Sequence, residues 1–356
     1  MALTQVPNAM LSSDLQGVTP GFKNRIINGA MVIDQRNAGA SVTPVNAQFI
    51  TDRWQYNCTQ TNKFTAQQNQ GSVTPPSGFS NYLGVTSSSS YSVTSTDYFD
   101  LLHKIEGFNT ADLGWGASGA SSVILSFWVR SSLTGTFGGC FSNSGLNYSY
   151  PFSYTISSAN TWTQISLTIS GPTAGTWVGA TNGIGLWIIF GLGAGSSYTG
   201  GTSGVWAANS PNFINQPTGT VSVVGTNGAT FYITGVQLEK GSTATSFDYR
   251  PYSAELAMCQ RYFEKMPTGA SGYASVRTTD WYGYIHWQTE KRTAPTITLT
   301  GVVDLVGSIG DITNQTPTGI DQASVKTARI YRTGSAFTSQ AAFIYVTNNI
   351  AISSEL

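Results

Sequence analysis

The sequence has little charge of either sign. Asp, Glu, Lys and Arg make up 10% of the 356 residues, whereas about 25% is usual in soluble domains. Acidic and basic side chains number 17 each, so the formal net charge is zero and nothing electrostatic draws the chain to nucleic acid. Because solubility usually depends on charged side chains, we expect a chain of this composition to assemble into a larger object.

Cysteines and long apolar runs are scarce as well. The three cysteines, Cys58, Cys140 and Cys259, are far apart and odd in number, which excludes a complete disulfide framework and a CxxC metal site. We expect small, partly buried thiols. The most apolar stretch, residues 184–192, contains glycines and is too short for insertion into a membrane. Residues 1–15 lack a basic region before an apolar segment, so we expect synthesis in a cytoplasm without a signal peptide.

Residues suited to catalysis are few. The only histidines are His103 and His286, and His103 lies in an alternating pattern that places it on an apolar strand face. Hydrolysis needs convergent acids, or a nucleophile and a base, so we predict no enzymatic activity. Three carboxylates, Glu106, Asp112 and Asp248, could serve as calcium ligands. Ordinary surface or turn positions explain them better, and we predict neither a metal nor another cofactor.

Short β-type runs dominate residues 24–252, and clusters of Gly, Ser, Thr and Pro separate them. This pattern predicts a β-sandwich or jelly roll. Val123–Val129 is apolar on both faces and should be an interior strand, whereas Thr163–Ile169 is apolar on one face only. The predicted strands are Ala30–Ile33, Tyr98–Ile105, Val123–Val129, Thr163–Ile169, Gly185–Phe190 and Thr230–Leu238.

One helix and a second set of strands follow. Helical spacing predicts a helix over Ser253–Lys265, with Ser253 as N-cap and Pro267 beyond its end. It would form a connector over residues 253–267 between the first domain and a smaller C-terminal β-sandwich over residues 268–356. The strands predicted there are Tyr273–Val276, Trp281–Gln288, Thr296–Leu299, Ala323–Tyr331 and Ala341–Val346. Residues 1–23 have no core pattern and read as an extended arm or a disordered terminus.

Three segments carry a resemblance to known proteins. The strand and turn that begin Phe231–Lys265 resemble the closing strand of carbohydrate-binding jelly rolls. Its continuation is similar to tail-fibre and related structural proteins of tailed bacteriophages, as are Asn24–Arg36 and Ser126–Gly139. The resemblance implies a jelly roll at 24–252, an arm at 1–23 that docks on other virion proteins, a homotrimeric fibre and a place on the tail or capsid exterior.

Aromatic residues are the main candidates for a binding site. They make up 12% of the chain, and rings that stack on the apolar faces of sugars let a neutral protein hold neutral glycans. In the first domain the candidates lie in or beside glycine-rich stretches, among them 71–90 and 191–204; they are Trp115, Trp177, Tyr198 and Trp206. Core packing is the ordinary alternative for each.

The second domain offers another aromatic pair. Alternation places Trp281, Ile285 and Trp287 toward the core and leaves Tyr282 and Tyr284 on the opposite face, as a ligand platform or a subunit interface.

Three functions compete. The resemblance favours a short tail fibre or receptor-binding fibre that adheres to host cell-surface polysaccharide without cleaving it. A capsid-decorating or head-fibre protein is the alternative. A depolymerase tailspike is less consistent with the sequence, because no repeat of the period of a long β-helix is present.

Overall fold

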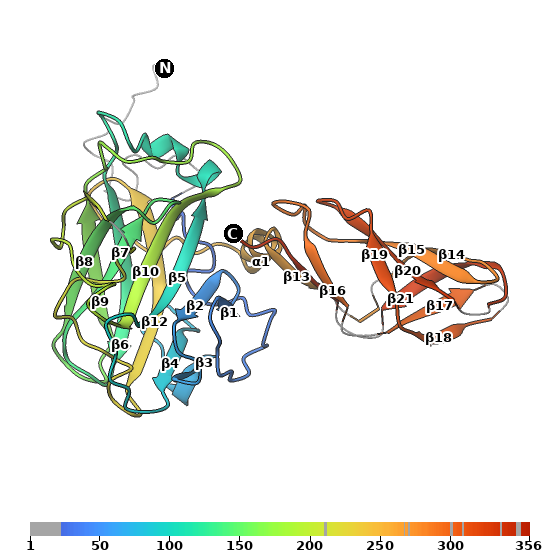
Figure 1. Ribbon diagram of the computed structural model, residues 1–356, viewed down its shortest axis with the longest axis horizontal. Helices are drawn as coiled ribbons and strands as arrows, with labels where there is room; N and C mark the ends of the chain where they lie inside the picture. The colour runs from blue at the N-terminus through green and yellow to red at the C-terminus, as the bar shows by residue number, and fades with distance from the viewer. Residues whose placement is uncertain are drawn as a thin grey trace, which may run out of the picture. The chain divides into compact units, whose positions relative to one another are not determined.

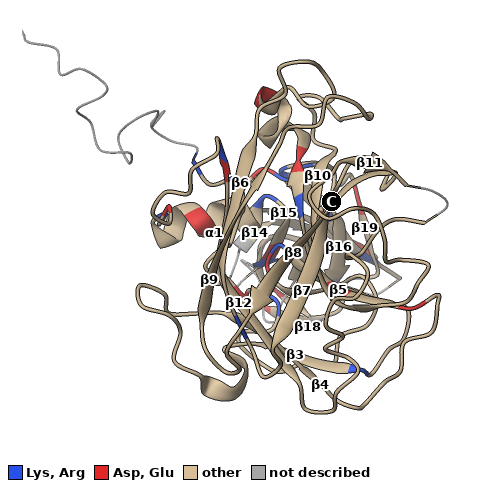
Figure 2. Ribbon diagram, turned by 90° about the vertical axis from the view of Figure 1, so that its left-hand side faces the viewer, with Lys and Arg blue, Asp and Glu red and all other residues tan. Residues whose placement is uncertain are grey.

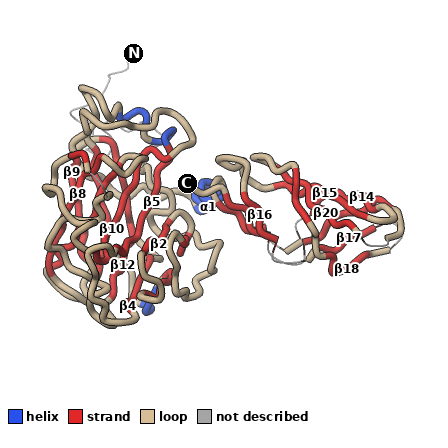
Figure 3. Tube along the Cα trace, in the orientation of Figure 1, coloured by secondary structure: helices blue, strands red, loops and turns tan. Residues whose placement is uncertain are grey.

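The computed structural model describes residues 23–209, 212–266, 268–269, 271–299, 302–307, 310–334, 337–346 and 350–356. Strands dominate them (Figure 3), so the predicted all-β class is confirmed. The chain forms two compact units, Met1–Arg250 and Pro251–Leu356. Of the expected arm, only Lys23 lies among the described residues.

Two antiparallel sheets form the first unit (Figure 1), in the layered arrangement of a jelly-roll sandwich. The seven-stranded sheet runs in the order β1 (Gln48–Thr51), β2 (Trp54–Cys58), β5 (Tyr98–Glu106), β10 (Ile184–Ala194), β7 (Gly135–Ser142), β8 (Tyr148–Ile156) and β11 (Ala207–Ala208). The five-stranded sheet runs β3 (Phe64–Gln68), β4 (Leu83–Ser87), β12 (Thr230–Lys240), β6 (Val123–Ser131) and β9 (Thr163–Ile169). Short 3-10 turns occupy Gln70–Ser72, Gly107–Asn109 and Ala111–Leu113.

The inner faces of the two sheets share one apolar core. Phe127 on β6 meets Phe190 on β10 with ring centroids 5.2 Å apart, which joins the sheets. As predicted, β6 is an interior strand, between β12 and β9. The edge strand β9 alternates between exposed residues and partly or fully buried ones. His103 is buried on β5, and its Nε2 atom lies 3.0 Å from the carbonyl oxygen of Ile27.

Residues 30–33 form no strand, so that prediction was wrong. Asn28, at φ 60°, donates from its side chain to the carbonyls of Ile33 and Asp52, and its amide oxygen accepts from the Ile33 N–H. Its side chain thus takes the hydrogen bonds that a neighbouring strand would make, which lets the buried segment turn sharply. The glycine-rich stretches also contain structure, because β4 lies within 71–90 and β10 extends to Ala194.

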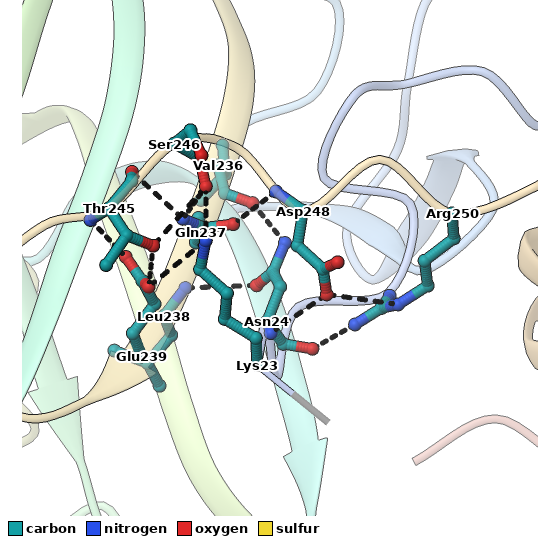
Figure 4. A network of polar contacts seen from close by, with 10 residues as sticks. All are labelled: Lys23, Asn24, Val236, Gln237, Leu238, Glu239, Thr245, Ser246, Asp248 and Arg250. Atoms are coloured by element: carbon teal, nitrogen blue, oxygen red, sulfur yellow. Dashed lines mark hydrogen bonds and ion pairs between the residues drawn. The ribbon is translucent and has the colours of Figure 1, made fainter. Parts of the chain in front are cut away.

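A polar clasp joins the start of the first unit to its end (Figure 4). Asn24 is buried; its amide nitrogen donates to the Val236 carbonyl, and its oxygen accepts from the N–H groups of Ile26 and Leu238. The guanidinium of Arg250 donates to the carbonyls of Asn24 and Ile26. These contacts lie at a β-bulge between Thr234 and Gln237, where regular strand pairing is interrupted. Lys23 also contacts this part of the unit, through the Ser246 carbonyl at 2.6 Å.

The second unit contains helix α1 (Tyr252–Gln260) and two further antiparallel sheets. The three-stranded sheet runs β13 (Phe263–Met266), β22 (Ile350–Ser353) and β16 (Thr296–Leu299). The seven-stranded sheet runs β18 (Ile312–Gln315), β17 (Val303–Gly307), β21 (Gln340–Val346), β14 (Ser271–Val276), β15 (Asp280–His286), β20 (Thr327–Thr333) and β19 (Gly319–Asp321).

The bounds of the predicted helix and of one predicted strand were wrong. Helix α1 ends at Gln260, and Phe263–Met266 is a strand because its backbone pairs with β22. Pro251, not Ser253, occupies the N-cap position, and Pro267 lies outside the described residues. The expected strand 323–331 begins only at Thr327, since the Ser324 hydroxyl accepts from the N–H of Thr327 and closes a turn.

The core of the second unit follows the predicted alternation. Trp281, Ile285 and Trp287 are buried, whereas Tyr284 is exposed on the opposite face. A buried ion pair between Lys291 Nζ and Glu264 Oε2, 2.6 Å apart, lies in the same unit. Burial lowers the pKa of Lys291, and the hydrogen bond and charge of Glu264 oppose that shift.

Replacing Asn24 by alanine tests the clasp. The change leaves two buried N–H groups and one buried carbonyl without their partner, so we expect the free energy of unfolding to fall by about 3 kcal/mol. Urea titration followed by tryptophan fluorescence measures it. Asn227→Ala, at an exposed turn, is the matched control. Equal stabilities of the two variants would contradict the importance of the clasp.

Candidate functional site

Three of the predicted aromatic residues form one cluster in the first unit. The ring centroids of Trp115 and Trp177 are 4.9 Å apart. The ring centroid of Trp206 lies 5.5 Å from that of Trp115 and 5.4 Å from that of Trp177. Tyr148 stacks on Trp206 with a centroid distance of 5.9 Å and an interplanar angle of 5°. Tyr150, on the same face of β8, lies 5.3 Å from Trp206. The cluster therefore brings together rings from residues far apart in the sequence.

The indole N–H groups of this cluster are occupied. Trp115 donates to the Ser121 carbonyl, Trp177 to that of Ala174 and Trp206 to that of Ser170. All three tryptophans are half-buried. A hollow of about 80 Å³ lies between Trp115 and Trp177, whereas ligand pockets usually measure roughly 300–1,000 Å³. The cluster mainly fastens three loops to one another.

A larger cavity lies at the β8–β11 end of the seven-stranded sheet. Its volume is about 510 Å³, within the usual range for small-ligand sites. Its lining consists of hydroxyls, amides, glycines and small apolar groups: Ser149, Pro151, Ser196, Ser197, Thr199, Gly200, Gly201, Ala207, Ala208, Asn209, Asn212 and Ile214. No charged side chain belongs to this lining among the described residues. The cavity suits a neutral ligand rich in hydroxyl groups.

Strand alternation decides which residues reach this cavity. On β8, Tyr150 points into the core and Ser149 and Pro151 point to the other side, which we call the outer face of the seven-stranded sheet. Ala207 is paired with Ser149 in the register of β11 and β8. Residues 195–206 and 212–216, which we name the covering segment, cover this face, and Ile214 packs against the buried pair Leu102 and Ile189. Side chains from the sheet and from this covering segment thus line the open cavity together.

A turn centred on Asp97 anchors the start of the covering segment. The Asp97 carbonyl accepts from the Gly195 N–H at 2.9 Å, and the Ser95 carbonyl accepts from the Ser197 N–H at 2.9 Å. Burial disfavours ionisation of Asp97, but its carboxylate accepts hydrogen bonds from the Thr94 N–H and from the hydroxyls of Tyr91, Thr94 and Thr59. Together these bonds lower the pKa of Asp97 from 3.8 to about 2.

Tyr198 lies apart from the tryptophan cluster. Its ring packs against Tyr98 and Phe213, with centroids 4.8 Å and 5.0 Å away. Its neighbours Ser197 and Thr199 line the cavity, so Tyr198 helps to shape the cavity wall. Its role in binding stays a prediction.

An aromatic row crosses the exposed face of the large sheet in the second unit. Val306 on β17 pairs with Phe343 on β21, and Phe343 pairs with Tyr273 on β14. Tyr284 lies on β15 beside Tyr273, one residue beyond the Gly283–Ala274 pair. Their side chains are 42%, 54%, 75% and 43% exposed in that order. We name the three rings of Phe343, Tyr273 and Tyr284, together with the neighbouring Val306, the aromatic row.

Tyr282 lies on the same strand as Tyr284 but is covered by cations. The guanidinium of Arg277 lies 4.5 Å from its ring centroid and that of Arg329 5.6 Å. Sequence reasoning found Tyr282 and Tyr284 but missed Tyr273 and Phe343, since the pairing of β14 with β21 cannot be read from either strand alone. The cavity was missed as well. Its lining comes from three separate parts of the chain.

The carboxylates considered as calcium ligands have other contacts. Asp112 forms an ion pair with Arg25 at 2.7 Å, and Asp248 accepts from the Asn24 N–H at 3.3 Å. Within the described parts of the chain, no three His, Cys, Asp or Glu side chains gather as a metal site. Burial lowers the pKa of His103 well below its usual value, so this histidine is neutral. The three cysteines are free, and all three are buried, more fully than the predicted partial burial.

Comparisons with known proteins reveal similar folds only. No protein-family model matches, and neither does any curated protein. One similar solved structure is the enzymatically active domain of tailspike protein 4 of bacteriophage CBA120, at 15% identity and a TM-score of 0.32, covering 61% of this chain. This chain spans only 21% of the length of that one.

Two other similar solved structures are a carbohydrate-binding module and a part of a phage baseplate. The family 11 carbohydrate-binding module from Clostridium thermocellum, in complex with a mixed-linked tetrasaccharide, has 10% identity and a TM-score of 0.29, covering 56% of this chain and 96% of that one. The tripod from the baseplate of bacteriophage Tuc2009 has 12% identity and a TM-score of 0.23, covering 94% of this chain and 91% of that one.

None of the described helices is long and apolar enough to cross a membrane.

Replacing Asp97 by asparagine tests the anchoring turn. A folded-state pKa below the unfolded value means that ionised Asp97 stabilises the fold above pH 4 and that this stability is lost as the pH falls toward 2. We expect Asp97→Asn to lower the free energy of unfolding by about 2 kcal/mol at pH 7 and by about half of that at pH 3. Urea titrations at both pH values measure it.

The control is Asp311→Asn, at an exposed position. A loss for Asp97→Asn that is the same at pH 7 and pH 3 would show that the charge of Asp97 is not what holds the turn.

Proposed function

We propose that this chain is a structural protein of a bacteriophage virion, a short tail fibre or receptor-binding fibre that adheres to glycans of the host surface without cleaving them. The observation that carries the glycan-binding part is the uncharged cavity of about 510 Å³ on the outer face of the first unit. The phage part is supported by the resemblance of residues 24–36, 126–139 and 231–265 to tail-fibre and related proteins.

The chemistry of the cavity fits a neutral sugar. Hydroxyls of Ser196, Ser197 and Thr199 and the amide of Asn212 supply donors and acceptors, and Pro151 and Ile214 supply apolar contacts. An anionic sugar would enter without a cation to pair with, which is unfavourable. We therefore expect the ligand to be a neutral hexose or N-acetylhexosamine unit.

Adhesion, as opposed to hydrolysis, fits the same lining. Glycoside hydrolysis requires a pair of carboxyl groups on either side of the scissile bond, and the described lining of the cavity contains neither a carboxylate nor a histidine. A shallow neutral site should bind weakly, with a Kd between about 1 mM and about 1 μM. Several copies on one particle would raise the avidity by ~10²–10⁴.

Assembly into a homotrimer completes the proposal. The aromatic row exposes four large apolar side chains side by side, and such patches usually mark an interface or a binding platform. We favour an interface between copies, because a chain of zero net charge has little electrostatic repulsion to oppose association. Residues 1–23 would attach the trimer to other virion proteins.

Filling the cavity tests the glycan site. Ala207→Trp adds a large side chain from an exposed position of β11 that lines the cavity. We expect it to reduce adsorption to host cells at least tenfold, because the ring occupies the space of the sugar. Flow cytometry with the fluorescently labelled chain measures adsorption. Ala180→Trp, on an exposed loop outside the lining, should adsorb normally.

Two results would contradict the proposal. Unchanged adsorption of Ala207→Trp combined with a loss for Tyr284→Ala would move the site to the second unit. Release of oligosaccharides from purified host polysaccharide would make the protein an enzyme.

The oligomeric state tests the role of the aromatic row. Light scattering should give the mass of three chains for the wild type, and Tyr273→Ser with Phe343→Ser should shift it toward one chain, because polar groups would replace two exposed rings. Tyr252→Ser, a tyrosine that is 63% exposed on α1, is the control and should remain trimeric. A wild-type monomer at micromolar concentration would refute the trimer.

A further inference from the structure

A buried carboxylate lies on the outer face of the seven-stranded sheet of the first unit. Asp100 on β5 is 0% exposed. One of its oxygens, Oδ2, accepts a hydrogen bond from the Asn215 side-chain nitrogen at 2.7 Å. The other, Oδ1, has no hydrogen-bond donor among the described residues. Such a buried, half-satisfied carboxylate calls for a positively charged or donating partner.

Two further oxygens gather beside it. The side-chain oxygens of Asn215 and Gln216 are buried and likewise have no donor among the described residues. Gly191 on β10 is the register partner of Asp100. A Cβ atom at Gly191 would lie 1.9 Å from Gln216 Oε1 and 2.8 Å from Asn215 Oδ1. Only glycine leaves room for the two amide oxygens at this position.

The donor set decides which partner fits. It contains one carboxylate oxygen and two amide oxygens, without sulfur or imidazole, and this chemistry selects a hard cation. Calcium accepts carboxylate and amide carbonyl oxygens in flexible geometry, whereas magnesium holds several waters and demands a regular octahedron. We propose that Asp100, Asn215 and Gln216 form part of a calcium site between the outer face of the seven-stranded sheet and the segment that covers it.

A cation at this place would fix the wall of the cavity. The Asn215 N–H donates to the Tyr198 carbonyl at 2.8 Å, and the Gln216 carbonyl accepts from the Gly200 N–H at 3.3 Å. Thr199 forms a parallel bridge with Gln216, and both Thr199 and Gly200 line the cavity. The ion would tie β5 to the covering segment through side chains of both. This site stands whether or not the cavity binds a glycan.

Calcium alone is the probe. The full chain is first passed over a chelating resin to remove metal ions. It is then heated in three solutions: buffer alone, buffer with about 1 mM calcium chloride, and buffer with about 1 mM magnesium chloride. Because a ligand that binds only the folded state raises its stability, we expect calcium to raise the unfolding midpoint by at least ~3 °C and magnesium to have much less effect. Equilibrium dialysis should find one calcium per chain.

Variants assign the site. Asp100→Asn should abolish the calcium-dependent rise, and Asp311→Asn, an exposed carboxylate of the second unit, should retain it. Gln216→Met keeps the side-chain volume and removes one oxygen; it should weaken calcium binding at least tenfold and decides the assignment if Asp100→Asn does not fold. No calcium-dependent rise in the wild type, or a full rise in either Asp100→Asn or Gln216→Met, would overturn the proposal.

Discussion

The packing of two sheets against each other across one apolar core is the constraint on which the rest of the first unit depends. Rings such as Phe127 and Phe190 meet between the sheets, so one face of most strands is committed to the core. The opposite face of the seven-stranded sheet carries polar groups such as the Asp100 carboxylate beside apolar side chains such as Leu102 and Ile189. The covering segment shields these residues from water, and the cavity lies between the sheet and the covering segment.

Charged residues are sparse along the described chain (Figure 2). In the first unit, several of them hold segments in place. Asp97 fixes the turn from which the covering segment starts, and Arg250 binds the carbonyls at the start of the unit. The cavity between these anchors has a neutral lining in the described residues. In a chain with 10% charged residues, hydrogen bonds to backbone groups hold the loops in place, as ion pairs do in more highly charged proteins. The surface between these loops can then stay uncharged and suited to neutral ligands.

Aromatic side chains serve different purposes in the two units. In the first unit, Trp115, Trp177 and Trp206 pack edge to face and donate to backbone carbonyls, which is an arrangement for fastening loops. In the second unit, Tyr273 and Phe343 lie on one sheet face with most of their side chains exposed. Exposed rings in a row gain most from contact with another surface, so the two units differ in what their rings can do.

The sequence by itself determined the all-β class, the interior place of β6, the one-sided burial of β9 and the faces of β15, because alternation with a period of two is a local property of a strand. Only the tertiary structure decided the turn at Asn28, the end of the helix at Gln260 and the gathering of three tryptophans. Each depends on partners remote in the sequence: Asn28 donates to the Asp52 carbonyl, β13 pairs with β22, and Trp206 packs against Trp115. The cavity belongs to this second group, since its lining exists only once β8, β11 and the covering segment have been folded onto one another.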